Sequence, residues 1–245
     1  MEWKIVHIDE TDSTNRWLKN YATADKHAAD TVVVANYQTA GRGCGTNTWE
    51  SERGKNLLFS VLVHPADVLA ADQFILSMAN ALALSDTLSD YADDVSIKWP
   101  NDIYWKDSKL CGTLIETTLQ GNHIMDCIIG TGINVNQTCF LSDAPNPISL
   151  CQILGHAVDR DEVLQKVLDN LAKYMEMIRT GHHEIIRKHY RRQLYRMGET
   201  HLYRFADGQE AYCKLVNVTD DGHLELLHDN RETYLMAFKE VQFVI

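Results

Sequence analysis

Two lysines beside an amide and a carboxylate form the first cluster in this sequence that could do chemistry. Residues 98–102 read Lys-Trp-Pro-Asn-Asp, and Lys109 follows shortly after them. The amide oxygen of Asn101 and the carboxylate of Asp102 suit Mg²⁺, which takes one or two protein oxygens together with phosphate oxygens. Lys98 and Lys109 would supply the positive charge that such an anionic ligand needs. Taken alone, this segment is explained equally well as a surface turn with solvated charges.

A glycine-rich loop with a single arginine is the second candidate. Residues 38–49 (QTAGRGCGTNTW) follow a β-branched run at 31–35. Glycines let a backbone approach a ligand and point its N–H groups at an anion, and the guanidinium of Arg42 can bind a carboxylate or phosphate through two hydrogen bonds. No Lys-Ser or Lys-Thr pair closes the loop, which argues against a P-loop. A flexible surface loop is the alternative, but it fits poorly with Arg42 and Trp49 lying between two apolar strands.

Hydrophobic periodicity predicts the elements that would position these residues. Strands are expected at 4–8, 31–37, 57–63, 95–99, 103–105, 110–119 and 123–135. Helices are expected at 71–91, 148–155, 161–180 and 182–194, and residues 12–15 offer N-caps for another. Asn101 and Asp102 then lie at a strand end, where an α/β sheet collects its ligand groups. Gly130 and Gly132 lie inside a strand, which indicates either close approach of a ligand or a β-bulge.

Four segments together resemble, in order and spacing, the signature segments of the biotin protein ligases. They are 41–49, 98–102, 109–112 (KLCG) and 130–135 (GTGINV), with a further match at Asp12-Ser13-Thr14-Asn15. The resemblance implies an α+β fold with a mixed sheet and helices, related to class II aminoacyl-tRNA synthetases, over residues 1–195. It also implies an SH3-like β-barrel over 196–245. Five short extended runs agree with a barrel, and the turn signals between them are Asp207-Gly208, Asp221-Gly222 and Asp229-Asn230.

The resemblance implies an ATP-dependent ligase that makes biotinyl-5′-AMP, releases pyrophosphate and transfers biotin to a lysine of a biotin carboxyl carrier domain. The implied catalytic residues are Lys109, Arg42 and Asp102. The implied biotin-binding residues are Ser13, Thr14, Asn15, Gln38, Gly41, Arg42, Lys109 and Gly112. The implied ATP-binding residues are Arg42, Gly43, Trp49, Lys98, Asn101, Lys109 and Asn134. Mg²⁺ would bind at Asn101 and Asp102, and Asp102 could instead accept a proton during transfer.

Charge and composition exclude several classes of binding partner. A net charge of −11 over 245 residues argues against a nucleic-acid-binding surface, and the basic helix expected at 182–194 is interpreted as a solvated face. No stretch approaches the length needed to span a bilayer, so we expect a cytoplasmic protein without membrane contact. No CxxC pair occurs among the six cysteines, so neither zinc nor disulfides are indicated. The chain is expected to be a monomer or homodimer without the DNA-binding repressor domain that some family members carry.

Two other functions are compatible with the same segments. A lipoate or octanoate ligase shares the fold and the adenylating lysine, but it lacks polar contacts to a ureido ring. Ser13, Thr14 and Gln38 therefore favour biotin. A non-catalytic module that holds the adenylate without transferring it is the alternative from a different class.

One position departs from the family pattern. Many members carry an arginine directly after the Gly-Arg-Gly triplet, where this chain has Cys44. We hypothesise that Arg42 carries more of the phosphate binding here, with Lys55 or the backbone N–H groups of the Cys44-Gly45 turn as substitutes.

Cys44→Arg is therefore expected to slow dissociation of the adenylate about ten- to a hundredfold, the worth of one charge-assisted contact. The enzyme is loaded with biotin and ATP, free ligand is removed, and release is timed for wild type and variant. Equal release rates would show that charge at this position does not govern retention.

Overall fold

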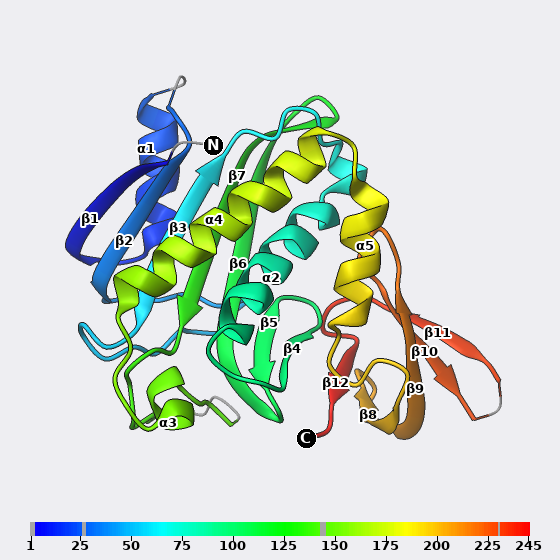
Figure 1. The fold of residues 1–245 in the computed structure, drawn as a ribbon. Helices are drawn as coiled ribbons and strands as arrows, with labels where there is room; N and C mark the ends of the chain where they lie inside the picture. The colour runs from blue at the N-terminus through cyan, green and yellow to red at the C-terminus, as the bar shows by residue number, and fades with distance from the viewer. Residues whose placement is uncertain (1–2, 26–27, 143–145, 230) are drawn as a thin grey trace.

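A seven-stranded mixed sheet forms the centre of the molecule. The computed structural model describes residues 3–25, 28–142, 146–229 and 231–245. The strand order is β1-β2-β3-β7-β6-β5-β4 (Figure 1). The strands are β1 (Lys4–Thr11), β2 (Thr31–Gln38), β3 (Leu57–Val63), β4 (Val95–Lys98), β5 (Asp102–Trp105), β6 (Ser108–Gln120) and β7 (His123–Ile133). In the described residues only β1 and β2 pair in parallel, and every other neighbouring pair is antiparallel.

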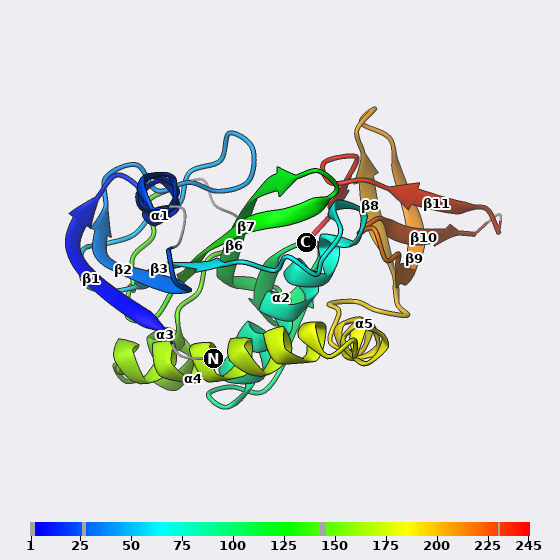
Figure 2. The same ribbon diagram turned by 90° about the horizontal axis from the view of Figure 1, so that it is seen from above.

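Helices cover both faces of this sheet. Figure 2 shows α1 (Thr14–Ala24) on one face, with α2 (Phe74–Ser89), α4 (Arg160–Arg179) and α5 (His183–Arg192) on the other. Because helices lie on both sides, all seven residues of β3 are buried, which explains its continuous apolar run. A short 3₁₀ helix, η1 (Ala70–Asp72), precedes α2, and α3 (Leu150–Leu154) precedes α4. No helix in the described ranges is long and apolar enough to cross a membrane.

The C-terminal residues form a separate antiparallel sheet. Its order is β11-β10-β9-β8-β12. The strands are β8 (Thr200–Phe205), β9 (Glu210–Val218), β10 (Leu224–His228), β11 (Thr233–Met236) and β12 (Val241–Phe243). Five strands were expected and five are found, an arrangement consistent with an SH3-like domain. Within the described ranges β11 and β12 lie at opposite ends of the order, so the sheet is open rather than a closed barrel. Gly208 and Gly222 have the positive φ values of tight turns, whereas Asn230 lies outside the described residues.

Candidate active site

Three of the sequence segments meet in one row across the sheet. In the antiparallel register Lys98 pairs with Asp102, Asp102 with Gly112, and Gly112 with Gly132. Directly paired residues of adjacent strands project to the same face, so these four positions lie side by side on β4, β5, β6 and β7. The expectation that Asn101 and Asp102 lie at a strand end is confirmed, since β4 ends at Lys98 and β5 begins at Asp102. Asp102 begins β5 after a hairpin turn, and the site lies across antiparallel strands.

A β-bulge turns Lys109 into this row. Lys109 and Gly112 are three positions apart, which in a regular strand would place their side chains on opposite faces. The register of β5 with β6 shifts between Ile103 and Tyr104, leaving an extra residue on β6 between Lys109 and Gly112. As a result Nζ of Lys109 lies 2.8 Å from Oδ1 of Asp102. The Lys109 backbone is held from its other side, since its N–H donates to the carbonyl of Asn146 at 2.8 Å.

The glycines of the row make room for the ring of Trp49. A Cβ built on Gly132 would lie 2.4 Å from Cε2 of Trp49, and one built on Gly112 would lie 2.9 Å from Cζ3. The indole therefore lies directly on the backbones of β6 and β7, and Nζ of Lys109 is 5.7 Å from the ring centroid. In the described chain the indole Nε1 is buried without a hydrogen-bond partner. A ligand acceptor at that atom would satisfy it.

Gly132→Ala is expected to lower the free energy of unfolding by about 1–3 kcal/mol, because the new methyl group overlaps the ring of Trp49. In a Trp49→Ala background the same change is expected to be neutral or stabilising, since alanine restricts the unfolded chain more than glycine does. Urea denaturation of the four proteins measures both effects. An equal cost in the two backgrounds would mean that the ring does not lie on this strand.

A polar cluster lies at the start of α1. The side-chain oxygen of Gln38, at the end of β2, accepts hydrogen bonds from the Thr14 backbone N–H at 2.8 Å and from its hydroxyl at 3.0 Å. Ser13 is the N-cap residue of α1, inside the segment 12–15 that was expected to supply it, but its side chain makes no cap hydrogen bond. The hydroxyl oxygen of Ser60 on β3 lies within hydrogen-bonding distance of two neighbours, 2.7 Å from Oγ1 of Thr14 and 2.6 Å from Oδ1 of Asn15. The side chains of this cluster thus offer hydroxyl and amide groups to a ligand.

Arg42 is held by a carboxylate from the centre of the sheet. Its guanidinium lies 3.2 Å from the carboxylate oxygens of Glu116 on β6. The same carboxylate accepts a hydrogen bond from Nδ2 of Asn15 at 2.9 Å. Glu116 therefore connects the glycine-rich loop with the polar cluster. Neither Glu116 nor Ser60 was singled out in the sequence, because an alternating polar residue in a strand carries no distinguishing signal.

Asn101 contacts the glycine-rich loop. Its Nδ2 donates to the Thr113 carbonyl and lies 3.0 Å from the Cys44 sulfur. Burial raises the pKa of the Cys44 thiol, which is therefore neutral at pH 7. Asn134, just after β7, donates to the Ile148 carbonyl at 3.1 Å. The amide nitrogens of both asparagines are thus used to hold the walls of the site.

These residues surround one cavity of about 1000 Å³. The predicted site residues that line it are Ser13, Thr14, Gln38, Arg42, Gly43, Trp49, Lys98, Asn101, Asp102, Lys109, Gly112 and Asn134. Asn15 and Gly41 do not line it, and their direct ligand contacts stay predictions. The C-terminal sheet contributes wall residues that the sequence analysis missed, namely Phe238, Lys239, Val241, Gln242 and Phe243. They were missed because the pattern of a small β domain does not show which of its edges faces the first domain.

Lys98 is a partly buried cation of the site. Its Nζ lies 4.9 Å from the ring centroids of Tyr104 and, from the C-terminal sheet, Phe243. Burial lowers the pKa of Lys98, the charge of Lys109 lowers it further, and Asp102 opposes both. An added anion would therefore be attracted to this position.

The donor set at the β4–β5 turn fits Mg²⁺ as an ion shared with phosphates. Lys109 engages Oδ1 of Asp102, and among the described residues no hydrogen bond is formed to its second oxygen. Asn101 adds an amide oxygen, since its nitrogen faces Thr113. Magnesium accepts so small a set when phosphate and water supply the remaining ligands. No group of three or more His, Cys, Asp or Glu residues within the described ranges forms a site made by protein ligands alone.

Comparison with known proteins assigns the family. Residues 8–134, more than half of the chain, match the biotin/lipoate A/B protein ligase family, and the chain belongs to it. It is 33% identical over 67% of its length to the bifunctional ligase/repressor BirA of Bacillus subtilis, covering 51% of that protein. It is 30% identical over 89% of its length to the biotin–[acetyl-CoA-carboxylase] ligase of Paracoccus denitrificans, covering 92% of it. The chain thus spans about half the length of the BirA relatives it matches.

A solved structure is similar along nearly the whole chain. The biotin protein ligase of Aquifex aeolicus, in complex with biotin and ATP, superposes with a TM-score of 0.81 at 26% identity. The match covers 98% of this chain and 99% of that one. It includes the C-terminal sheet as well as the seven-stranded sheet, so both parts of the fold agree with that of a biotin protein ligase.

Proposed function

We propose that this protein is a biotin protein ligase that activates biotin with ATP and transfers it to a lysine of a carboxyl carrier domain. The observation that carries the proposal is the row in which Lys98, Asp102 and Lys109 lie beside the glycines of β6 and β7. A neutral polar pocket lies at one part of the same cavity, and cations line another. Biotin, with a neutral ureido ring and an anionic carboxylate, matches this division.

The first step joins two anions, so positive charge has to be in place before it occurs. A carboxylate oxygen of biotin attacks the α-phosphorus of ATP, a new phosphorus–oxygen bond forms, and the bond to pyrophosphate breaks. Lys109 is the cation that the bulge aims at this point. Arg42 and Lys98 neutralise the carboxylate and phosphate charges around it. Mg²⁺, held at Asp102 and Asn101, would offset the charge of the nucleotide phosphates.

In the second step the neutral amine of the carrier lysine attacks the carbonyl carbon of the mixed anhydride, and AMP leaves. The attacking amine must give up a proton. The second carboxylate oxygen of Asp102 would take it, a role supported by the contact of Lys109 with the first oxygen alone. Asp102 would thus bind the metal during activation and serve as a proton acceptor during transfer.

The polar cluster favours biotin over lipoate or octanoate. A dithiolane ring or an alkyl chain would leave Ser13 and Thr14, which line the cavity and are almost fully buried, without ligand partners. A ureido ring has both donors and acceptors to offer. We further propose a carboxyl carrier domain as the protein partner, a monomeric or homodimeric state and a cytoplasmic location.

The test is one incubation with four arms. Purified protein, ATP and Mg²⁺ are mixed with labelled biotin or labelled lipoate, with and without a carboxyl carrier domain. We expect label on the carrier only with biotin and ATP together. Label from lipoate would assign the other branch of the family, and adenylate without any transfer would indicate a non-catalytic module.

A further inference from the structure

Lys239 reaches from the C-terminal sheet to the tip of the glycine-rich loop. Residues 41–49 form a small hairpin, in which Trp49 N–H donates to the Gly41 carbonyl and Gly43 N–H to that of Asn47. Gly45 lies at its tip with φ of 69°. A Cβ built on Gly45 would lie 2.3 Å from Nζ of Lys239, so the ammonium group lies against this tip. Lys239 also lines the cavity together with the loop.

The charge of Lys239 has no acidic partner among the described residues, and its Nζ lies 6.0 Å from the ring centroid of Phe238. Arg42 is paired with Glu116 and Lys109 with Asp102. Lys239 forms no ion pair with any described residue. The nearby Glu240 instead accepts a hydrogen bond from the backbone of Ala237 at 2.8 Å. A cation at the cavity wall without a counter-charge is available to an anionic ligand.

The fold fixes the place of Lys239. The turn before β12 holds it in a left-handed conformation with φ of 75°, which is uncommon for a lysine. Its neighbour Phe238 packs edge-to-face on Trp99, whose indole N–H donates to the Gly222 carbonyl at 2.9 Å. A strained backbone at a residue that lines a cavity points to a role for its side chain.

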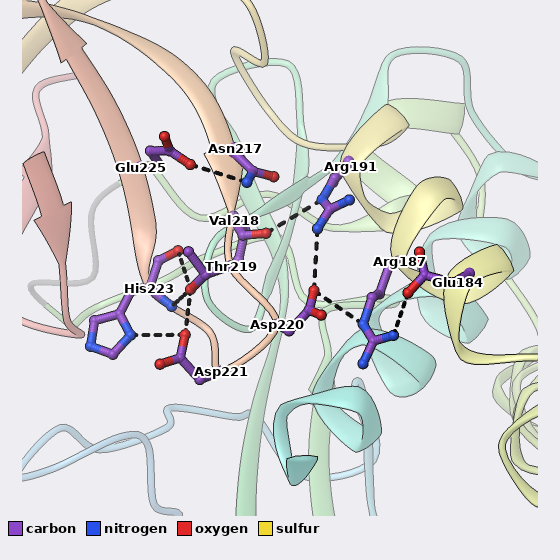
Figure 3. A network of polar contacts seen from close by, with 10 residues as sticks. All are labelled: Glu184, Arg187, Arg191, Asn217, Val218, Thr219, Asp220, Asp221, His223 and Glu225. Carbon is purple, nitrogen blue, oxygen red and sulfur yellow. Dashed lines mark hydrogen bonds and ion pairs between the residues drawn. The ribbon is translucent and has the colours of Figure 1, made fainter. Parts of the chain in front are cut away.

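An ion-pair network at the turn between β9 and β10 connects the C-terminal sheet to α5. Figure 3 shows Asp220, in the turn between β9 and β10, facing two arginines of α5. Its Oδ1 lies 3.1 Å from Nε of Arg187 and 3.3 Å from a terminal nitrogen of Arg191. Arg187 is also paired with Glu184 at 2.7 Å, and its side chain is only 13% exposed. The sheet that carries Lys239 is therefore connected to the helical layer by ion pairs.

We infer that Lys239 is a phosphate-binding residue that the C-terminal sheet contributes to the nucleotide site, a role that rests on the proposed ATP-dependent reaction. It supplies the positive charge that the loop lacks at Cys44. The hypothesised substitute Lys55 is exposed and does not line the cavity. A nucleotide phosphate between Lys239 and the backbone of the hairpin tip would hold the loop and the C-terminal sheet together.

The test compares Lys239→Gln with Lys214→Gln, a matched change at an exposed lysine of β9 outside the cavity. Calorimetry measures binding of α,β-methylene-ATP to the biotin-loaded protein, because this analogue cannot release pyrophosphate. We expect Lys239→Gln to weaken binding about ten- to a hundredfold, and Lys239→Arg to restore most of it. Biotin affinity should stay within about twofold of wild type in all three, since Lys239 is not part of the polar cluster.

The variant Lys239→Gly distinguishes a loss of nucleotide binding from a loss of folding stability. Glycine adopts the left-handed conformation without strain. The melting temperature of the Lys239→Gly protein should therefore equal or exceed that of wild type, while nucleotide binding still weakens. Equal affinity for the analogue in Lys239→Gln and Lys214→Gln would overturn the inference. Because the analogue is not turned over, this result is independent of ligase activity. Absence of carrier labelling by the wild-type protein would count against the proposed function alone.

Discussion

Lys109→Ala is expected to lower the rate of biotin-dependent adenylate formation by about a hundred- to a thousandfold, the usual cost of removing one preorganised group that stabilises developing charge. Lys109 is the cation that the β6 bulge places beside Asp102, at 2.8 Å. Its backbone hydrogen bonds to the 146–148 segment do not depend on its side chain. The fold should therefore persist, with a small loss of stability from the unpaired Asp102.

The measurement is exchange of labelled pyrophosphate into ATP, together with the melting temperature of each protein. Lys55→Ala is the matched control, because Lys55 is exposed and lies outside the cavity. Exchange at nearly the wild-type rate in Lys109→Ala would remove this lysine from the mechanism. A collapse of the melting temperature would show instead that Lys109 has a mainly structural role.

Asp102→Asn is expected to raise the Mg²⁺ concentration needed for half-maximal exchange and to lower turnover about tenfold or more, the worth of one charge-assisted contact. The substitution keeps the shape of the side chain and removes its charge. Biotin affinity should change much less, because Asp102 contacts Lys109 and not the polar cluster around Thr14 and Gln38. Titrations of Mg²⁺ and of biotin on the same preparations separate the two effects.

A double variant of Lys109 and Asp102 provides a second test of their roles. Since Lys109 and Asp102 act together in one ion pair, the double variant should be little worse than Lys109→Ala alone. Losses that multiply independently would indicate two unrelated roles. Equal losses in biotin binding and in Mg²⁺ dependence for Asp102→Asn would identify Asp102 as a structural residue.

Much of the fold could be predicted from hydrophobic patterning. The strand Leu57–Val63 is confirmed at both ends, because an uninterrupted apolar run between polar residues leaves little choice. The helix expected at 161–180 is Arg160–Arg179, ended before Gly181, which has a φ of 75°. The strands expected at 110–119 and 123–135 are β6 and β7 within a few residues. These elements follow from local sequence, and tertiary contacts only adjust their ends.

The arrangement of the site could be predicted only in part from the sequence. The sequence segments indicated which residues gather, and the register shows how Lys98, Asp102, Gly112 and Gly132 come into one row. The bulge that turns Lys109 could not be predicted, because the pairing of β5 with β6 decides it rather than the residues of β6 alone. Ser13 takes the N-cap position, as segment 12–15 predicted, but the side-chain hydrogen bond to the helix comes from another residue. Gln38, distant in sequence, binds the first N–H group of α1.

Two contacts between segments distant in the chain could not be predicted from the sequence. Glu116 holds Arg42 across 74 positions, and Lys239 meets Gly45 from the other sheet. A charged residue in a strand or a turn gives no sign of its partner, because the pairing depends on how segments distant in sequence pack in the fold. The same holds for Phe243, which packs over Lys98.

The central claim is that this cavity joins the carboxylate of biotin to the α-phosphate of ATP. Pyrophosphate exchange with the unmodified protein tests it most directly, since that reaction needs neither a carrier nor any variant. With ATP, Mg²⁺ and labelled pyrophosphate, we predict rapid exchange that begins on addition of biotin and does not begin with lipoate or octanoate. Exchange that proceeds without biotin, or that lipoate supports equally well, would contradict the account.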